Sequence, residues 1–183
     1  MKELSLNILD IAKNSTAAGA SEIVISLVTD ANGILTLSVS DNGCGMNEET
    51  LKRVLDPFYT TRTTRKVGMG IPLLRLAAEQ TGGEVKISST TDESLHGTEL
   101  TATFDTKHID FCPIGDIVSS ICVLISGNPE IDIVFTDVTP ERSVSLDTKE
   151  LRALLGDVSL AEYEVIAWIR KYLSAQYDSE VII

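Results

Sequence analysis

The chain has 183 residues, with 43% hydrophobic and 23% charged side chains, a balance typical of a folded globular protein rather than a disordered tail or fibrous repeat. Its formal net charge is −12, so the surface as a whole repels nucleic acid and anionic membranes, and neither is an expected partner. No apolar run approaches the ~20 residues that cross a bilayer, and the amino terminus lacks a signal-peptide pattern. We therefore expect a soluble, cytoplasmic protein whose cysteines, Cys44, Cys112 and Cys122, are free thiols.

Residues 1–105 are predicted to form an α+β unit with two layers. Leu4, Ile8 and Ile11 have the spacing of an amphipathic helix, which Gly19 ends. The segment 30–33, Asp-Ala-Asn-Gly, is a strong turn signal between two β-rich runs and predicts a hairpin. The expected elements are, in order, a helix over 2–18, strands over 23–28 and 34–39, a long irregular stretch, a helix from Pro72 to about 81, and strands over 84–89 and 98–104.

Residues 106–183 are predicted to form a small C-terminal α+β extension of unknown role. Its expected elements are a helix over 117–125, strands over 132–138 and 143–146, and two helices, the last over 160–177. In this last helix Val165, Ile169, Tyr172 and Leu173 share one side, with Trp168 adjacent, which predicts that the side packs against the rest of the protein.

Polar residues on the first predicted helix begin a candidate site. Asp10 and Asn14 are four residues apart and therefore lie on one face of that helix. Taken alone, the pair also fits solvent exposure or capping. Asp41 ends the second predicted strand and opens the segment 41–46, Asp-Asn-Gly-Cys-Gly-Met, whose glycines let backbone approach a ligand closely. Alone, the same residues make an ordinary turn.

A basic stretch follows in an otherwise acidic chain. Residues 52–66 contain five basic residues and one acidic residue. Gly68 and Gly70 then precede the helix predicted from Pro72, where backbone N–H groups and the helix dipole can hold phosphate oxygens. Thr98 adds a hydroxyl at the start of the last strand of this unit. Each of these signals is weak by itself.

In this order the pieces resemble the Bergerat-fold (GHKL) ATP-binding family, which includes DNA gyrase, large heat-shock chaperones, mismatch-repair ATPases and the ATP-binding domain of sensor histidine kinases. The resemblance covers residues 3–105. Its motifs are the N box at 9–15, a glycine box at 41–46, a phenylalanine box at 57–61, a second glycine box at 68–70, and Gly97-Thr98. The resemblance implies a two-layer α/β sandwich that binds ATP and Mg²⁺.

The resemblance also implies roles for individual residues. Asn14 would hold Mg²⁺, and Asp41 would accept a hydrogen bond from the adenine amino group. The further nucleotide-binding residues are Gly43, Gly45, Met46 and Thr98 around the base, Gly68, Met69 and Gly70 near the phosphates, and Thr61, Arg62, Arg65 and Lys66 in a lid. Asp10 is the candidate catalytic residue. It replaces the glutamate usual in hydrolysing members and is shorter by one methylene, which leaves ATP hydrolysis open.

Three functions remain open from the sequence. The first is a stand-alone regulatory kinase that acts on a partner protein, with Asp10 as the base. The second is an ATP-hydrolysing conformational switch. The third is a nucleotide sensor or adaptor, because the whole chain also resembles small ATP-binding proteins encoded beside iron-only hydrogenases in anaerobic bacteria. We expect neither His96 nor His108 to be a phosphoacceptor, and the sequence leaves a homodimer open.

Overall fold

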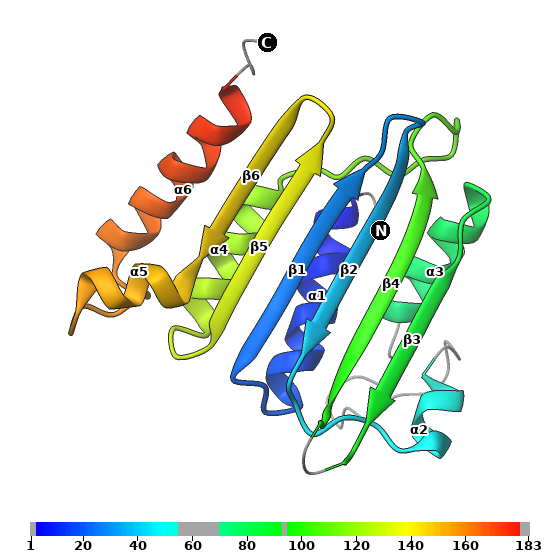
Figure 1. Cartoon of the computed structure of the whole chain (residues 1–183), viewed down its shortest axis with the longest axis horizontal. Coiled ribbons are helices and arrows are strands. Elements are labelled where there is room, and N and C mark those ends of the chain that lie inside the picture. Colours follow the sequence, from blue (N-terminus) through cyan, green and yellow to red (C-terminus); the bar gives the residue numbers. More distant parts are fainter. Residues whose placement is uncertain (1–2, 55–69, 93–94, 180–183) are drawn as a thin grey trace.

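A computed structural model describes residues 3–54, 70–92 and 95–179. Six strands form one sheet in the order β3-β4-β2-β1-β5-β6, and helices α1, α3 and α4 cover one face of it (Figure 1). This is the two-layer α+β arrangement that the sequence predicts. The strands are β1 (Glu22–Thr29), β2 (Ile34–Asp41), β3 (Val85–Thr90), β4 (Gly97–Asp105), β5 (Asp132–Thr139) and β6 (Arg142–Asp147). The helices are α1 (Leu4–Ala17), α2 (Glu48–Arg53), α3 (Gly70–Gln80), α4 (Ile117–Gly127), α5 (Thr148–Leu155) and α6 (Tyr163–Asp178).

The predicted hairpin of the first unit is confirmed, and the start of α3 is corrected. β1 and β2 pair antiparallel, and Gly33 in their turn has φ +89°, a value that favours glycine. α3 includes Gly70, two residues before the predicted start at Pro72. Pro72 is tolerated there because the N–H groups of a helix's first turn have no partner within the helix.

Helix α2 lies within the stretch that the sequence predicts to be irregular, which is a correction to that prediction. It is six residues long and has no buried side chain, so it carries no hydrophobic periodicity. Neighbouring residues stabilise this helix. Asn47 caps its amino end, where the Asn47 side chain accepts a hydrogen bond from Thr50 N over 2.9 Å. Exposed i,i+4 ion pairs also join Glu48 to Lys52 and Glu49 to Arg53.

The C-terminal segment extends the same sheet. β5 pairs parallel with β1, placing Ile25 opposite Phe135, and β6 pairs antiparallel with β5. α4 packs beside α1 and α6, on the side of the sheet that lies behind the strands in Figure 1. A domain boundary near residue 105 stays a prediction.

The core lies between the sheet and its helices. Along each central strand, alternate side chains are buried, as the period of a strand requires. Phe104 and Phe135 are the largest fully buried side chains, and Leu4 and Ile8 of α1 pack in the same cluster. Each such side chain contributes roughly 1.5 to 3 kcal/mol through burial, so this packing fixes α1 against the sheet.

Helix α6 covers the β6 edge, with one correction to its predicted face. Val165, Ile169 and Leu173 are buried as expected, but Tyr172 is 41% exposed and stacks on Trp168 with ring centroids 4.9 Å apart. Gln176 Oε1 accepts a hydrogen bond from Ser145 N over 2.9 Å, and Gln176 Nε2 donates to Ser145 O over 3.0 Å. This side chain thus satisfies edge-strand backbone groups that a further strand would otherwise pair.

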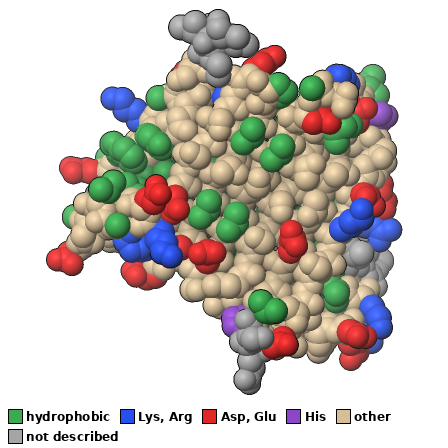
Figure 2. Space-filling model, viewed as in Figure 1, with side chains coloured by type: hydrophobic (Ala, Val, Ile, Leu, Met, Phe, Trp, Pro, Cys, Tyr) green, Lys and Arg blue, Asp and Glu red, His purple; other side chains and the backbone are tan. Residues whose placement is uncertain are grey.

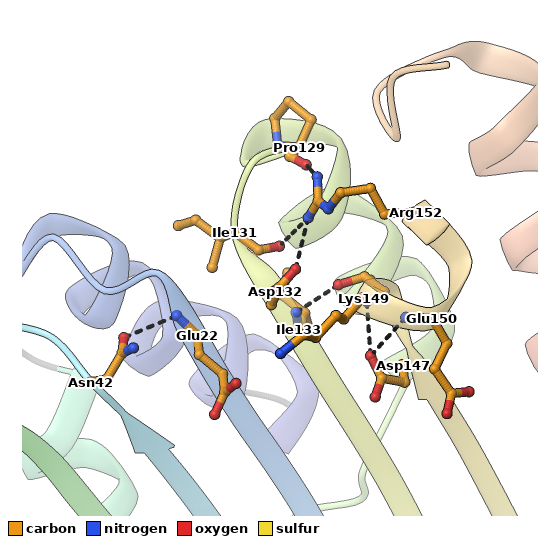
Figure 3. A network of polar contacts seen from close by, with 11 residues as sticks. Glu22, Asn42, Pro129, Ile131, Asp132, Ile133, Asp147, Lys149, Glu150 and Arg152 are labelled. Carbon is orange, nitrogen blue, oxygen red and sulfur yellow. Dashed lines mark hydrogen bonds and ion pairs between the residues drawn. The ribbon is translucent and has the colours of Figure 1, made fainter. Parts of the chain in front are cut away.

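Polar contacts anchor the starts of β1 and β5 at one end of the sheet (Figure 3). Arg152 of α5 donates hydrogen bonds to the carbonyl oxygens of Pro129 and Ile131 and pairs with Asp132 over 3.1 Å. Asn42, which follows β2, accepts hydrogen bonds from Ser21 N and Glu22 N over 2.9 Å each. The loop after β2 is therefore tied to the strand that pairs with β5. Among the described helices, none is long and apolar enough to cross a membrane.

Candidate functional site

The first part of the site is the side of α1 that faces α3. Asp10 and Asn14 lie one turn apart on α1, as the sequence predicts. Gly70 is buried against this side: a Cβ on Gly70 would lie 2.3 Å from Asp10 Oδ2. Glycine at the start of α3 therefore lets its backbone come directly beside the Asp10 carboxylate.

The second part is Asp41, the last residue of β2. Ser15, which follows Asn14 on α1, donates a hydrogen bond from Oγ to Asp41 Oδ2 over 2.6 Å. Gly43 N donates to Asp41 Oδ1 over 2.9 Å. The carboxylate is held from two sides, and each oxygen keeps a lone pair that can accept a further hydrogen bond.

The third part is a hydroxyl pair beside Asp41. Thr98 is directly opposite Asp41 in the β2–β4 pairing and directly opposite Ser89 in the β3–β4 pairing. Ser89 Oγ accepts a hydrogen bond from Met46 N over 2.7 Å and lies 2.8 Å from Gly97 O and 2.9 Å from Thr98 Oγ1. One serine therefore joins the loop after β2 to the start of β4.

Glycines allow the backbones of this region to approach each other. Gly45 has φ +69°, and a Cβ on it would lie 1.9 Å from Thr90 O. Gly97 has φ +148°, and a Cβ on it would lie 2.1 Å from Asp41 O. His96 Nδ1 also lies 2.7 Å from Gly43 O. Larger residues at Gly45 or Gly97 would force these segments apart.

In the described part of the chain, the predicted site residues fall into two groups. One is Asp10 with Gly70. The other is Asp41 with Gly43, Gly45, Met46 and Thr98. Both groups lie beside α1, and Asn14 precedes Ser15, which contacts Asp41. The other predicted residues, Thr61, Arg62, Arg65, Lys66, Gly68 and Met69, lie outside the described residues, as does the phenylalanine box. Their roles stay predictions.

Two residues of the site were given no role from the sequence, Ser15 and Ser89. The sequence carries a signal for Ser15, because this serine continues the apolar stripe of Leu4, Ile8 and Ile11 at helical spacing. In the structure Ser15 is 4% exposed. A serine in such a stripe needs a hydrogen-bond partner. Ser89 had no comparable signal, since its importance comes from its place opposite Thr98.

The donor set fits an adenine nucleotide with Mg²⁺. A fixed carboxylate at Asp41 can accept from an exocyclic amino group, and the neighbouring Thr98 hydroxyl can donate or accept. The Asn14 carboxamide offers the oxygen ligand that Mg²⁺ prefers. Asp41 of β2 and Thr98 of β4 lie at one end of the sheet, and Ser15, the residue after Asn14 on α1, contacts Asp41 there.

Comparison with known proteins identifies the family. Residues 1–108 match the family described as "Histidine kinase-, DNA gyrase B-, and HSP90-like ATPase", and the chain belongs to this family. The family and the site together support ATP binding. This confirms the Bergerat-fold resemblance that the motifs predict.

Curated relatives match about half of this chain. A "Putative sensor protein" of Shewanella frigidimarina (strain NCIMB 400) is 35% identical over 91 residues, which are 49% of this chain and 14% of that protein. "Sporulation kinase E" of Bacillus subtilis (strain 168) is 34% identical over 89 residues, 49% of this chain and 12% of that protein. The chain thus spans only a small part of the length of these relatives.

Solved structures share the fold over most of the chain. The N-terminal domain of a DNA repair protein has a TM-score of 0.57 at 15% identity and covers 86% of this chain and 58% of its own. The Aquifex aeolicus MutL ATPase domain complexed with ADP has a TM-score of 0.53 at 14% identity and covers 85% of this chain and 69% of its own. At these identities the likeness concerns the fold.

Proposed function

We propose that this chain binds Mg·ATP at the cluster around Asp41 and Asn14 and acts as a regulatory kinase on a partner protein. The observation that carries the nucleotide site is the 2.6 Å hydrogen bond from Ser15 to Asp41, because it joins α1, with Asp10 and Asn14, to the sheet end that carries Thr98. Membership of a family that includes histidine-kinase-like ATPases supports the same proposal.

Base recognition would depend on the Asp41 carboxylate. With Ser15 and Gly43 holding it, Asp41 accepts the adenine amino group without reorienting. Guanine presents an oxygen at the equivalent position, so two acceptors would oppose each other. Thr98 and Ser89 would lie beside Asp41 at the same base site, where Ser89 holds the backbone N–H of Met46.

Metal and phosphate would lie along α1. Asn14 is the residue that would hold Mg²⁺, and the ion, when bound, offsets phosphate charge. Asp10, placed beside the backbone of Gly70, is the candidate base for an acceptor hydroxyl on the partner. In that transfer the bond from the γ-phosphorus to its bridging oxygen breaks, a bond to the acceptor oxygen forms, and Asp10 takes the hydroxyl proton.

Curated relatives support a kinase over the alternatives. Sporulation kinase E and the "Signal transduction histidine-protein kinase AtoS" of Escherichia coli (strain K12), which is 29% identical over 89 residues, are kinases by name. Their similarity to this chain is confined to 49% of it, so its phosphoacceptor and partner are unassigned. The hydrogenase-associated adaptor role stays a prediction.

Calorimetric titration of the full chain with ADP and GDP tests the nucleotide site. We expect ADP to bind and GDP to bind at least tenfold more weakly. Asp41→Asn should weaken ADP binding by about ten- to a hundredfold, since a hydrogen bond to a charged group contributes about 1.5 to 3 kcal/mol. The matched control is Asp105→Asn, at the opposite end of β4, which should bind ADP like the wild type. Unchanged binding by Asp41→Asn would refute the site.

Kinase activity requires a separate test. The chain is incubated with γ-labelled ATP and the proteins that copurify with it from its source. Label on a copurifying protein, lost in Asp10→Asn while ADP binding persists, supports the kinase. Phosphate release without protein labelling would instead identify the ATP-driven switch, and nucleotide binding with neither would identify the sensor.

A further inference from the structure

The face of the sheet opposite the helices is built in regular rows. Residues paired across neighbouring strands line up, and the middle row contains only hydroxyl side chains on five adjacent strands. This row is Thr101 on β4, Ser38 on β2, Ser26 on β1, Thr136 on β5 and Ser145 on β6. Thr136 Oγ1 lies 3.1 Å from Ser26 Oγ, as expected of neighbours in one row. We name this surface the open face.

Valines flank the hydroxyl row. On one side Val24 of β1 is opposite Val134 of β5, and on the other side Val28 is opposite Val138. These side chains are half-buried by their neighbours, except Val28, which is 43% exposed. Small side chains of this kind make a flat surface and lose little conformational entropy when another surface covers them.

Charge is nearly absent from the middle of the open face. Among the described residues of these three rows on β4, β2, β1 and β5, Glu99 is the one charged side chain. Figure 2 looks onto this face: most charged side chains lie toward its margins, and a few acidic ones lie within it. In a chain of net charge −12, such a surface is a place where two copies can meet without strong repulsion.

We propose that the open face is the contact surface of a homodimer, in which two copies pack sheet against sheet. The size fits. The six strands, about 4.8 Å apart and about eight residues long at ~3.3 Å per residue, give a face of roughly 750 Å². A standard stable interface buries ~800 Å² on each partner.

The chemistry of the open face is also self-complementary. A hydroxyl both donates and accepts, so a row of Ser and Thr can pair with a second copy of itself and leave no buried polar group unsatisfied. The valines on either side supply apolar contact in the same layer. A partner with charged residues at these positions would leave those charges buried without partners, which favours a second copy as the occupant.

Charged side chains at the margins of the open face have partners within one copy. On the β3 edge, Lys86, next to Thr101 in the middle row, pairs with Glu84. At the other edge, Asp132 pairs with Arg152. Neither Lys86 nor Asp132 therefore brings an unpaired charge into the contact, and a two-fold axis parallel to the strands would place the β3 margin of one copy over the β6 margin of the other.

Sedimentation equilibrium of the full chain tests the dimer. We expect the mass of two chains at micromolar concentration for the wild type. Val28→Lys should give one chain, because two lysines would be forced together in an apolar layer. The matched control is Val123→Lys, which places the same charge at a valine of α4 that is 52% exposed, and which should remain dimeric. A monomeric wild type, or equal behaviour of the two variants, overturns the proposal.

A second measurement does not depend on a disruptive substitution. Ser38→Cys, in the middle row, should form an intermolecular disulfide on mild oxidation, well above the level that the wild type forms through its exposed Cys44. Circular dichroism of each variant establishes that the fold is retained. No cross-linking above the wild-type level would place the contact elsewhere and reject the open face as the interface.

Discussion

The Ser15 hydroxyl and the Asp41 carboxylate are joined by a 2.6 Å hydrogen bond between residues 26 positions apart in the chain. Ser15 belongs to α1 and Asp41 ends β2, so this bond connects the two layers at the candidate site. It turns two separate sequence motifs, the N box and the first glycine box, into one arrangement of functional groups.

Ser15→Ala should weaken ADP binding about five- to tenfold, because Asp41 loses one of the two donors that orient it and the net contribution of such a bond is about 1 kcal/mol. Calorimetry measures the affinity. In a double-mutant cycle with Asp41→Asn the two losses should be far from additive, since both act through one carboxylate. Ser5→Ala removes another buried serine from α1, at its other end, and should leave ADP affinity unchanged. Additive losses would assign Ser15 a purely structural role.

Asn14→Ala should lower ATP affinity specifically when Mg²⁺ is present. We expect a loss of at least about tenfold with the metal and less than about threefold with EDTA, because the side chain is proposed to act through the ion. Asn14→Asp, which keeps an oxygen ligand, should retain most of the metal dependence. Titrations of both variants with and without Mg²⁺ provide the comparison, and equal losses under the two conditions would contradict the assignment.

Asn7→Leu should stabilise the protein. Asn7 is 3% exposed on α1, and its Oδ1 has no hydrogen-bond partner among the described residues. An apolar side chain of similar size removes this desolvation penalty and should raise the free energy of unfolding by about 1 kcal/mol. Urea unfolding measures the change. Asn7→Ala should instead lower the free energy of unfolding, because it leaves a cavity. A lower free energy of unfolding for Asn7→Leu would contradict the prediction and show that the amide has a partner.

Tyr177 should make stability fall at alkaline pH. Burial, together with its 2.7 Å hydrogen bond to the buried Asp137, raises the pKa of Tyr177 well above its usual value. Below pH ~10 the phenol is protonated in both the folded and unfolded chain, and above it only the unfolded chain loses the proton. The free energy of unfolding should therefore decline between about pH 10 and 11.5 by up to ~1.4 kcal/mol per pH unit from this group.

The matched variants for this prediction are Tyr177→Phe and Tyr163→Phe. Tyr177→Phe should reduce the fall of the urea midpoint at alkaline pH. Tyr163 is 84% exposed, so Tyr163→Phe should show the same fall as the wild type. At neutral pH Tyr177→Phe should also cost about 1 to 3 kcal/mol, because Asp137 loses a hydrogen-bond partner. An unchanged alkaline slope in Tyr177→Phe would show that another group causes the decline.

Local chemistry explains which elements could be predicted. The hydrophobic period of α1, the turn at Gly33 and the alternation of the strands are properties of neighbouring residues, so most elements were found within one or two residues of their observed ends. Helix α2 was missed because it buries no side chain and so has no period to detect. Tyr172 has the spacing of the buried side of α6 but is 41% exposed and stacks on Trp168.

The sequence by itself determined the family, the polar pair on α1 and the glycine-rich loop after β2, because these are motifs of fixed local spacing. Only the tertiary structure decided that Thr98 is opposite Asp41, that Ser89 holds Met46, and that β5 lies parallel to β1. Strand order and register depend on which distant segments bury each other's apolar faces, a property of the whole chain that no local window contains. The same register aligns the hydroxyl row of the open face.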